Sequence, residues 1–182
     1  EASAIWSYAF MEIMNNAIEH AKAKRISCCV KKNNLYTEIS ITDDGIGIFE
    51  NIKGYLEKEQ GYPADVQDAV LELYKGKLTT QRESHSGEGI FFVSKSLREF
   101  AIWSKQSVFT AGRCTEEKLI QSHLILYYTS LKSIGTMVVM KLENDTTHTL
   151  KEVFDMFAPI EEGFAKTVIP LKKVCPYGEP IA

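Results

Sequence analysis

Hydrophobic positions near the start of the chain recur three or four residues apart. Over residues 5–23 they are Ile5, Tyr8, Ala9, Ile13, Ala17 and Ala21. This spacing places them on one side of an α-helix, so we expect an amphipathic helix over the range. The helix has no capping signal and the chain has no initiator Met, which predicts that the natural chain begins further upstream.

Two short β-type runs follow, over residues 25–32 and 35–42, with Asn33 and Asn34 between them. An Asn pair suits a tight turn, so the two runs predict a β-hairpin. The second run alternates between apolar and polar residues and leads directly into Asp43, Asp44 and a pair of glycines. We expect the glycines to end the strand.

The remaining pattern is less regular. Residues 49–86 are polar and weakly patterned, and we predict one helix in them, over 64–74; so long a loop in a compact domain is often a functional lid. Helical spacing returns over 90–100. The rest of the chain predicts strands over 102–110, 118–129, 136–142 and 166–171, with a short helix over 150–157.

Composition narrows the classes of function. The 182 residues are 45% apolar and 25% charged, which is the profile of an ordinary globular domain. A net charge of −3 gives no field that would attract nucleic acid, and no apolar stretch approaches the ~20 residues that span a bilayer. The four cysteines form no CxxC pair, which disfavours zinc and a disulfide framework. We expect a cytosolic protein whose present segment binds neither nucleic acid nor membrane.

Three polar residues on the first helix are candidates for chemistry. Glu12, Asn16 and His20 fall four residues apart, on a face beside the apolar stripe. They are either exposed polar residues or part of a magnesium–phosphate site. In the second case an Asn oxygen would complete the octahedron of a Mg²⁺ ion held by phosphate and water, and Glu12 would polarise an attacking water or hydroxyl.

The sequence Asp43-Asp44-Gly45-Ile46-Gly47 also has two interpretations. It is either a tight turn in which the acids bind local amides or a site that binds a purine base. In a base site a buried carboxylate would accept a hydrogen bond from the exocyclic amine of adenine, and the glycines would admit the base close to the backbone.

Glycines also precede the predicted helix over 90–100 and the predicted strand over 136–142. Gly87 and Gly89 open the helix that contains Ile90, where free amides and the helix dipole would favour phosphate. A flexible hinge is the alternative interpretation. Gly135 and Thr136, before the strand over 136–142, carry little information by themselves.

Taken in order, these segments resemble the four boxes of the GHKL superfamily, which includes gyrase, heat-shock chaperone, histidine kinase and mismatch-repair ATPases. The matching segments are FMEIMNNAIEHA, ITDDGIGIF, SHSGEGIFFVSKSL and IGTMVVMKL. The resemblance implies a Bergerat fold, an α/β (α+β) two-layer sandwich with a mixed, mainly antiparallel sheet of about five strands and helices on one face. It implies an ATP-binding domain over residues 1–145 with a lid at about 49–86.

The resemblance also assigns roles. It implies that Asn16 holds Mg²⁺, Asp43 reads adenine, Thr136 supports Asp43 through water, and Gly87 and Gly89 wrap the phosphates. No basic residue immediately precedes Gly87, so His85 and Arg82 are alternatives for the phosphate contact. With Glu12 as the catalytic base, we expect ATP to be bound by Asn16, His20, Asp43, Gly45, Gly47, Ile48, Gly87, Gly89, Ile90 and Thr136.

Glu12 and Glu19 bear on the branch of the superfamily. A Glu four residues before the box Asn is similar to gyrase, mismatch-repair and anti-sigma serine kinases, whereas sensor histidine kinases usually carry a basic residue at the place of Glu19. His20 and the small domain are closer to the anti-sigma kinases. Residues 146–182 are expected to be a linker helix and the start of a second domain, because GFAKTVIPLKKV resembles the first strand of a STAS-like domain.

Three functions remain open at this point. The first is a regulatory domain that binds ATP and Mg²⁺ and has slow ATPase or serine/threonine protein-kinase activity. The second is the catalytic domain of a sensor histidine kinase, and the third is a nucleotide sensor that does not turn ATP over. We expect a protein partner that is a separate protein, a domain of the same chain or a second copy forming a homodimer.

Overall fold

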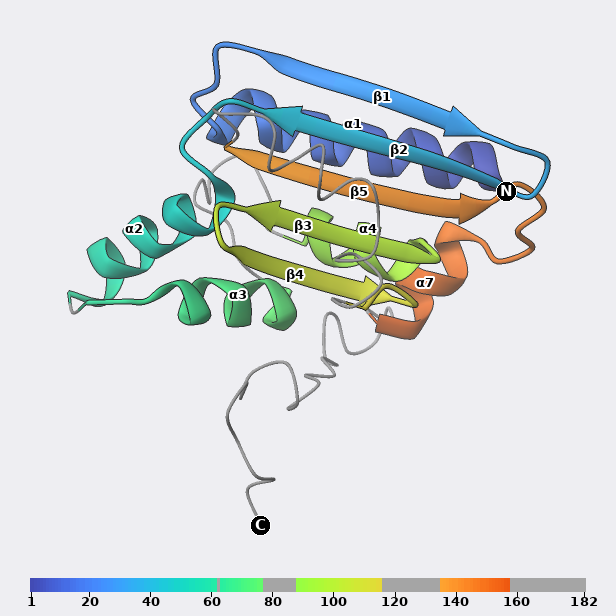
Figure 1. The fold of residues 1–182 in the computed structure, drawn as a ribbon. Coiled ribbons are helices and arrows are strands. Elements are labelled where there is room, and N and C mark those ends of the chain that lie inside the picture. Colours follow the sequence, from blue (N-terminus) through green and yellow to red (C-terminus); the bar gives the residue numbers. More distant parts are fainter. Residues whose placement is uncertain (62, 77–87, 116–134, 158–182) are drawn as a thin grey trace.

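The computed structural model describes residues 1–61, 63–76, 88–115 and 135–157 (Figure 1). Their strands form one five-stranded sheet in the order β1-β2-β5-β3-β4, and every neighbouring pair is antiparallel. This arrangement confirms the expected α+β fold with a mainly antiparallel sheet. The strands are β1 (Ile26–Lys32), β2 (Tyr36–Asp43), β3 (Glu99–Ser104), β4 (Ser107–Gly112) and β5 (Thr136–Glu143).

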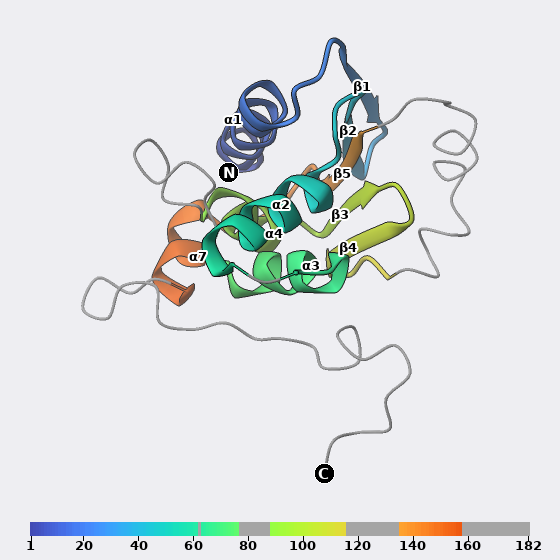
Figure 2. The same ribbon diagram turned by 90° about the vertical axis from the view of Figure 1, so that its left-hand side faces the viewer.

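The helices form the second layer. Figure 2 shows α1, α4 and α7 on one side of the sheet, with α2 and α3 continuing this layer. Apolar side chains from α1, α2, β2 and β5 meet between the layers, and the largest fully buried ones include Ile5, Phe49 and Met140. The helices are α1 (Ala2–His20), α2 (Ile48–Gln60), α3 (Val66–Lys75), α4 (Gly89–Ser96) and α7 (Leu150–Phe157).

The first helix and the hairpin agree with the sequence pattern, apart from the end of the helix. The prediction extended to residue 23, but α1 ends at His20. Lys22 takes a positive φ of 52°, which leaves the helical path, and the Ala21 carbonyl accepts a hydrogen bond from the Ile46 amide at 2.9 Å. This hydrogen bond holds the end of α1 against the loop after β2.

Residues 49–76 contain two helices, where the sequence predicted one. The predicted helix over 64–74 is α3, which begins with a capping box between Asp65 and Asp68. The helix missed is α2, which buries Phe49, Ile52 and Leu56 and is otherwise rich in charged residues. With Ile48 and Tyr55, these residues follow helical spacing, so the sequence did contain the periodic signal for α2. The lid over 49–86 stays a prediction, and residues 77–87 lie outside the described part of the chain.

The region after α4 also differs from the prediction. Helix α4 ends at Ser96, not at residue 100, and the single strand predicted over 102–110 is a hairpin of β3 and β4. Its turn uses Lys105 at a positive φ of 53°, so no glycine marks it in the sequence. The strands predicted over 118–129 and 166–171, and the STAS-like segment, lie outside the described residues.

The short helix predicted over 150–157 is confirmed as α7. It packs against α1 and α4 through Phe154, whose ring lies 4.3 Å from Phe92 of α4 and 5.7 Å from Tyr8 of α1, measured between ring centroids. Within the described ranges, no helix has the length and apolar character needed to cross a bilayer.

Candidate functional site

A cavity of about 300 Å³ lies among α1, α4 and the ends of β2 and β5. The structure brings most of the predicted site residues to its wall. Gly45 lies behind the wall, in contact with Asp43, and Gly87 lies outside the described residues. The predicted residues that line the cavity are Glu12, Asn16, His20, Asp43, Gly47, Ile48, Gly89, Ile90 and Thr136.

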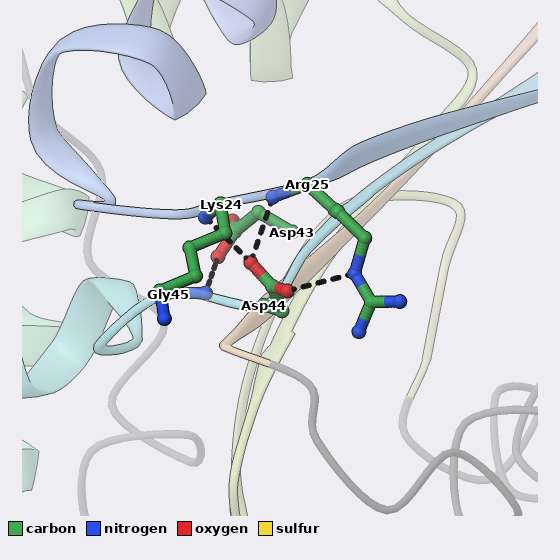
Figure 3. Close-up of polar contacts among 5 residues, drawn as sticks. All are labelled: Lys24, Arg25, Asp43, Asp44 and Gly45. Atoms are coloured by element: carbon green, nitrogen blue, oxygen red, sulfur yellow. Dashed lines mark hydrogen bonds and ion pairs between the residues drawn. The ribbon is translucent and has the colours of Figure 1, made fainter.

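Asp43 is the last residue of β2 and is 6% exposed. Its Oδ1 accepts a hydrogen bond from the Gly45 amide at 2.8 Å (Figure 3). Burial raises the pKa of this carboxyl above its ordinary value, and hydrogen bonds from Gly45 and Thr136 oppose the rise. A buried acceptor held in place at the wall of a cavity is suited to the exocyclic amine of a base.

Asp44 differs from Asp43 in its hydrogen-bond partners and in the direction of its pKa shift. Its Oδ1 accepts the backbone amides of Lys24 and Arg25 at 2.8 and 2.9 Å, and its Oδ2 lies 3.1 Å from Arg25 Nε (Figure 3). These hydrogen bonds lower the pKa of Asp44. Asp44 therefore joins the end of β2 to the start of β1, and only Asp43 lines the cavity.

Gly45 is required by close packing. A Cβ atom at this position would lie 2.0 Å from the Ala21 carbonyl oxygen and 2.9 Å from Asp43 Oδ1. The loop after β2 therefore passes directly against the end of α1. A larger residue would displace either this loop or the Asp43 carboxylate.

Thr136 begins β5 directly opposite Asp43 in the antiparallel register. Its side chain hydrogen-bonds the Asp43 carboxyl, and its Oγ1 also accepts the Ile48 amide at 3.0 Å. The water that the resemblance implies between the two residues stays a prediction. Thr136 thus connects the carboxylate to the first residue of α2.

Asn16 is oriented by its own helix. Its Nδ2 donates to the Glu12 carbonyl at 2.7 Å, which leaves Oδ1 as the side-chain atom that can ligate a cation. The described residues contain no group of three or more His, Cys, Asp or Glu that could hold a metal. A single amide oxygen suits a Mg²⁺ ion whose other ligands are phosphate oxygens and water.

The side chain of Glu12, a residue of α1, lies against the beginning of α4. A Cβ atom on Gly89 would be 2.0 Å from Glu12 Oε2, so a larger residue there would displace this carboxylate from its present position. The first amides of α4 form the positive end of a helix dipole. Glu12 is therefore placed where a bound phosphate would also be favoured.

The cavity has two ends, which we name by the residues at each. After the roles that the resemblance implies, we call Asp43, Gly47, Ile48 and Thr136 the adenine end and Glu12, Asn16 and Gly89 the phosphate end. Glu12 meets α4 and Ala21, the C-cap of α1, meets the loop after β2; these two residues are about 13.5 Å apart along the helix axis at 1.5 Å per residue. The span is comparable to that of an extended nucleoside triphosphate.

Several residues at the cavity were not predicted to belong to it. Tyr8 was assigned to the apolar stripe of α1, although its position four residues before Glu12 is a signal for the same face. Glu88 lies between Gly87 and Gly89 in the sequence. Phe92 and Phe154 gave no local signal, because they reach the cavity through the packing of α7 on α4.

Residues 5–143 match the family model of histidine kinase-, DNA gyrase B- and HSP90-like ATPases. The chain belongs to this family, and the matched region is an ATP-binding domain of the GHKL superfamily. Comparison with curated proteins gave no significant match. Helix α7 begins after the matched region ends.

Proposed function

We propose that this domain binds ATP together with Mg²⁺ and uses Glu12 as the general base for slow ATP hydrolysis or for phosphoryl transfer to a serine or threonine of a protein. The observation that carries the proposal is the placement of the Glu12 carboxylate against Gly89, at the amino-terminal end of α4. Such a carboxylate repels the terminal phosphate, so it contributes little to binding and is better suited to accepting a proton.

Binding begins at the adenine end. Asp43 accepts a hydrogen bond from the exocyclic amine, and Gly45 and Thr136 hold its carboxylate in place. At the phosphate end, Asn16 holds Mg²⁺ through Oδ1. A bound ion would supply positive charge against the phosphates, because the cavity wall also includes the acidic residues Glu12, Glu19, Asp43, Glu72 and Glu88.

The chemical step is a proton transfer coupled to phosphoryl transfer. Glu12 takes the proton from a water molecule or a hydroxyl group as the oxygen forms a bond to the terminal phosphorus. The bond from that phosphorus to the bridging oxygen breaks, and ADP leaves with the electron pair. The product is inorganic phosphate or a phosphorylated side chain.

The proposed setting is a cytosolic regulatory protein that acts on a protein partner or on another domain of its own chain. Glu19 supports a serine/threonine or ATPase branch, since the histidine kinases usually carry a basic residue at this place. The family match includes the histidine kinases, so transfer to histidine is the second candidate.

Incubation of the full-length protein with ATP labelled at the terminal phosphate tests the proposal. We expect free labelled phosphate, or an acid-stable label on serine or threonine of a protein, and neither without Mg²⁺. An acid-labile label would indicate transfer to histidine. Bound ATP that remains intact with the full chain and its partner present would overturn the proposal in favour of a nucleotide sensor.

A further inference from the structure

Helix α7 packs on α4, the helix whose first residue, Gly89, meets Glu12 at the phosphate end (Figures 1 and 2). Val153 of α7 is 8% exposed and forms one apolar cluster with Phe91 and Phe92 of α4. The position of α7 therefore depends on the same helix that is placed to receive the phosphates.

The rest of α7 and the segment before it are also held by α4. The Phe157 ring meets Phe91 edge to face, with centroids 5.4 Å apart, and the Lys95 ammonium lies 5.4 Å from the Phe157 centroid. His148 Nε2 donates a hydrogen bond to the carbonyl of Ser96, the last residue of α4, at 2.7 Å. Contacts of three kinds thus join α7 and its preceding segment to α4.

Helix α7 also reaches the cavity itself. Phe154 lines the cavity and contacts Tyr8 of α1, with ring centroids 5.7 Å apart. Tyr8 precedes Glu12 by four residues, so it lies about 6 Å farther from the adenine end at 1.5 Å per residue. Phe154 is therefore part of the wall at the far end of the cavity, beyond Glu12.

We propose that α7 is a working part of the nucleotide site: binding of the nucleotide's phosphates at the start of α4 and docking of α7 on α4 stabilise each other. The family match ends at residue 143 and α7 begins at Leu150, so α7 extends the site beyond the matched region. The inference rests on the part of the proposed function that places the phosphates at Gly89, and it does not depend on turnover.

The physical basis is that both events use α4. Phosphates bound by the first amides of α4 restrict the motion of this helix. A restricted α4 presents Phe91 and Phe92 to α7 at a smaller cost in conformational entropy, so docking becomes more favourable. By linkage, docked α7 raises the affinity for the nucleotide by the same factor. Occupancy of the site is thereby transmitted to the chain that follows residue 157.

Hydrogen–deuterium exchange of the full-length protein tests the first half of this coupling. We expect excess ATP with Mg²⁺ to slow the exchange of the α7 amides about fivefold or more, the usual range for two coupled sites. Adenosine at saturation occupies the adenine end alone and should leave α7 unchanged. Strand β1 is the internal control, because it lies at one edge of the sheet and none of its residues lines the cavity.

Two variants of α7 test the reciprocal half. Val153→Asp places a charge in the buried contact with α4 and should hold α7 undocked. Met156 is 65% exposed on the same helix, so Met156→Asp adds the same charge without disturbing the contact. Neither residue is among the described residues that line the cavity. We expect Val153→Asp to raise the ATP Kd about fivefold or more and Met156→Asp to leave it unchanged.

Three results would overturn the inference: bound ATP that leaves α7 exchange unchanged, adenosine that slows it as strongly as ATP, or equal ATP Kd values for the two variants. Val153→Asp should still bind adenosine like the parent, which shows that the domain is folded; if it does not, exchange in the parent decides alone. The proposed function fails on a separate observation, the absence of turnover, which neither exchange nor affinity measures.

Discussion

The two ends of the cavity are built in different ways. At the adenine end, Asp43 and Thr136 face each other on paired strands, and hydrogen bonds from Gly45 and Thr136 hold the carboxylate. At the phosphate end, Glu12 lies on a helix and meets another helix at Gly89. One end is fixed by the sheet, and the other depends on how two helices pack.

This difference suggests a division of labour. A buried acceptor that is already held in place provides affinity with little reorganisation on binding. Carboxylates gathered near phosphate oppose binding and make sense as groups that act during the chemical step. Substitutions at the two ends should therefore change different measured quantities.

Glu12→Gln should have the largest effect. The variant keeps the size of the side chain but loses its basicity, so we expect turnover to fall by about 10²–10⁴, the usual share of a general base. ATP affinity should stay within a few-fold of the parent. Phosphate release and isothermal titration calorimetry measure the two quantities.

Glu19→Gln is the matched control for this variant, because it removes the same charge from the same helix and cavity wall. A small change in turnover is expected. If the two variants reduce turnover equally, the effect is one of overall charge and Glu12 is not the base.

Asp43→Asn should have the next largest effect, which is a weakening of ATP binding. Losing a charged hydrogen-bond acceptor at a buried site costs about 1–3 kcal/mol, roughly a five- to 150-fold rise in Kd. Asp44→Asn makes the same change beside it, outside the cavity, and should alter the ATP Kd little. Competition binding with ATP and GTP checks both variants. Equal losses of affinity would contradict the assignment of the adenine contact to Asp43.

Asn16→Ala should remove the contribution of Mg²⁺ to thermal stability. A ligand at 100 times its Kd stabilises the folded state by about 2.7 kcal/mol, or roughly 5–10 °C in Tm for a domain of this size. Melting curves with ATP, with and without Mg²⁺, measure the part that depends on the ion. A variant that keeps the full shift would place the metal ligand elsewhere.

The smallest expected effect is a pH dependence of stability in the absence of nucleotide. The folded-state pKa of Asp43 is raised above 3.8, so between the two pKa values the folded state binds more protons than the unfolded state. The free energy of unfolding should therefore contain a term that falls as pH rises through this window. Urea unfolding of the parent and of Asp43→Asn should show the term in the parent alone.

The sequence predicted the site residues best where their positions follow from the regular spacing of a helix or a strand. The helical spacing of Glu12, Asn16 and His20 placed them on one face of α1, and the end of an alternating strand located Asp43. Both features are set by neighbours in the chain. The expected sheet of about five strands also agrees with the five strands that the structure describes, although β3 and β4 were predicted as one strand.

Apart from α2, the features missed depend on distant contacts or on unmarked turns. The β3–β4 turn at Lys105 uses a positive φ without glycine, so nothing in the sequence indicated a hairpin. Phe154 reaches the cavity only because α7 folds back on α4. Its contact with Tyr8 links residues 146 positions apart, which no local pattern can predict.

The division between the two ends is tested most directly by the dependence of the single-turnover rate on ATP concentration, measured with saturating Mg²⁺ for the parent, Glu12→Gln and Asp43→Asn. We predict that Glu12→Gln lowers the maximal rate and leaves the half-saturating concentration within a few-fold. Asp43→Asn should raise the half-saturating concentration and leave the maximal rate nearly unchanged. Changes by both variants in the same parameter would contradict the account.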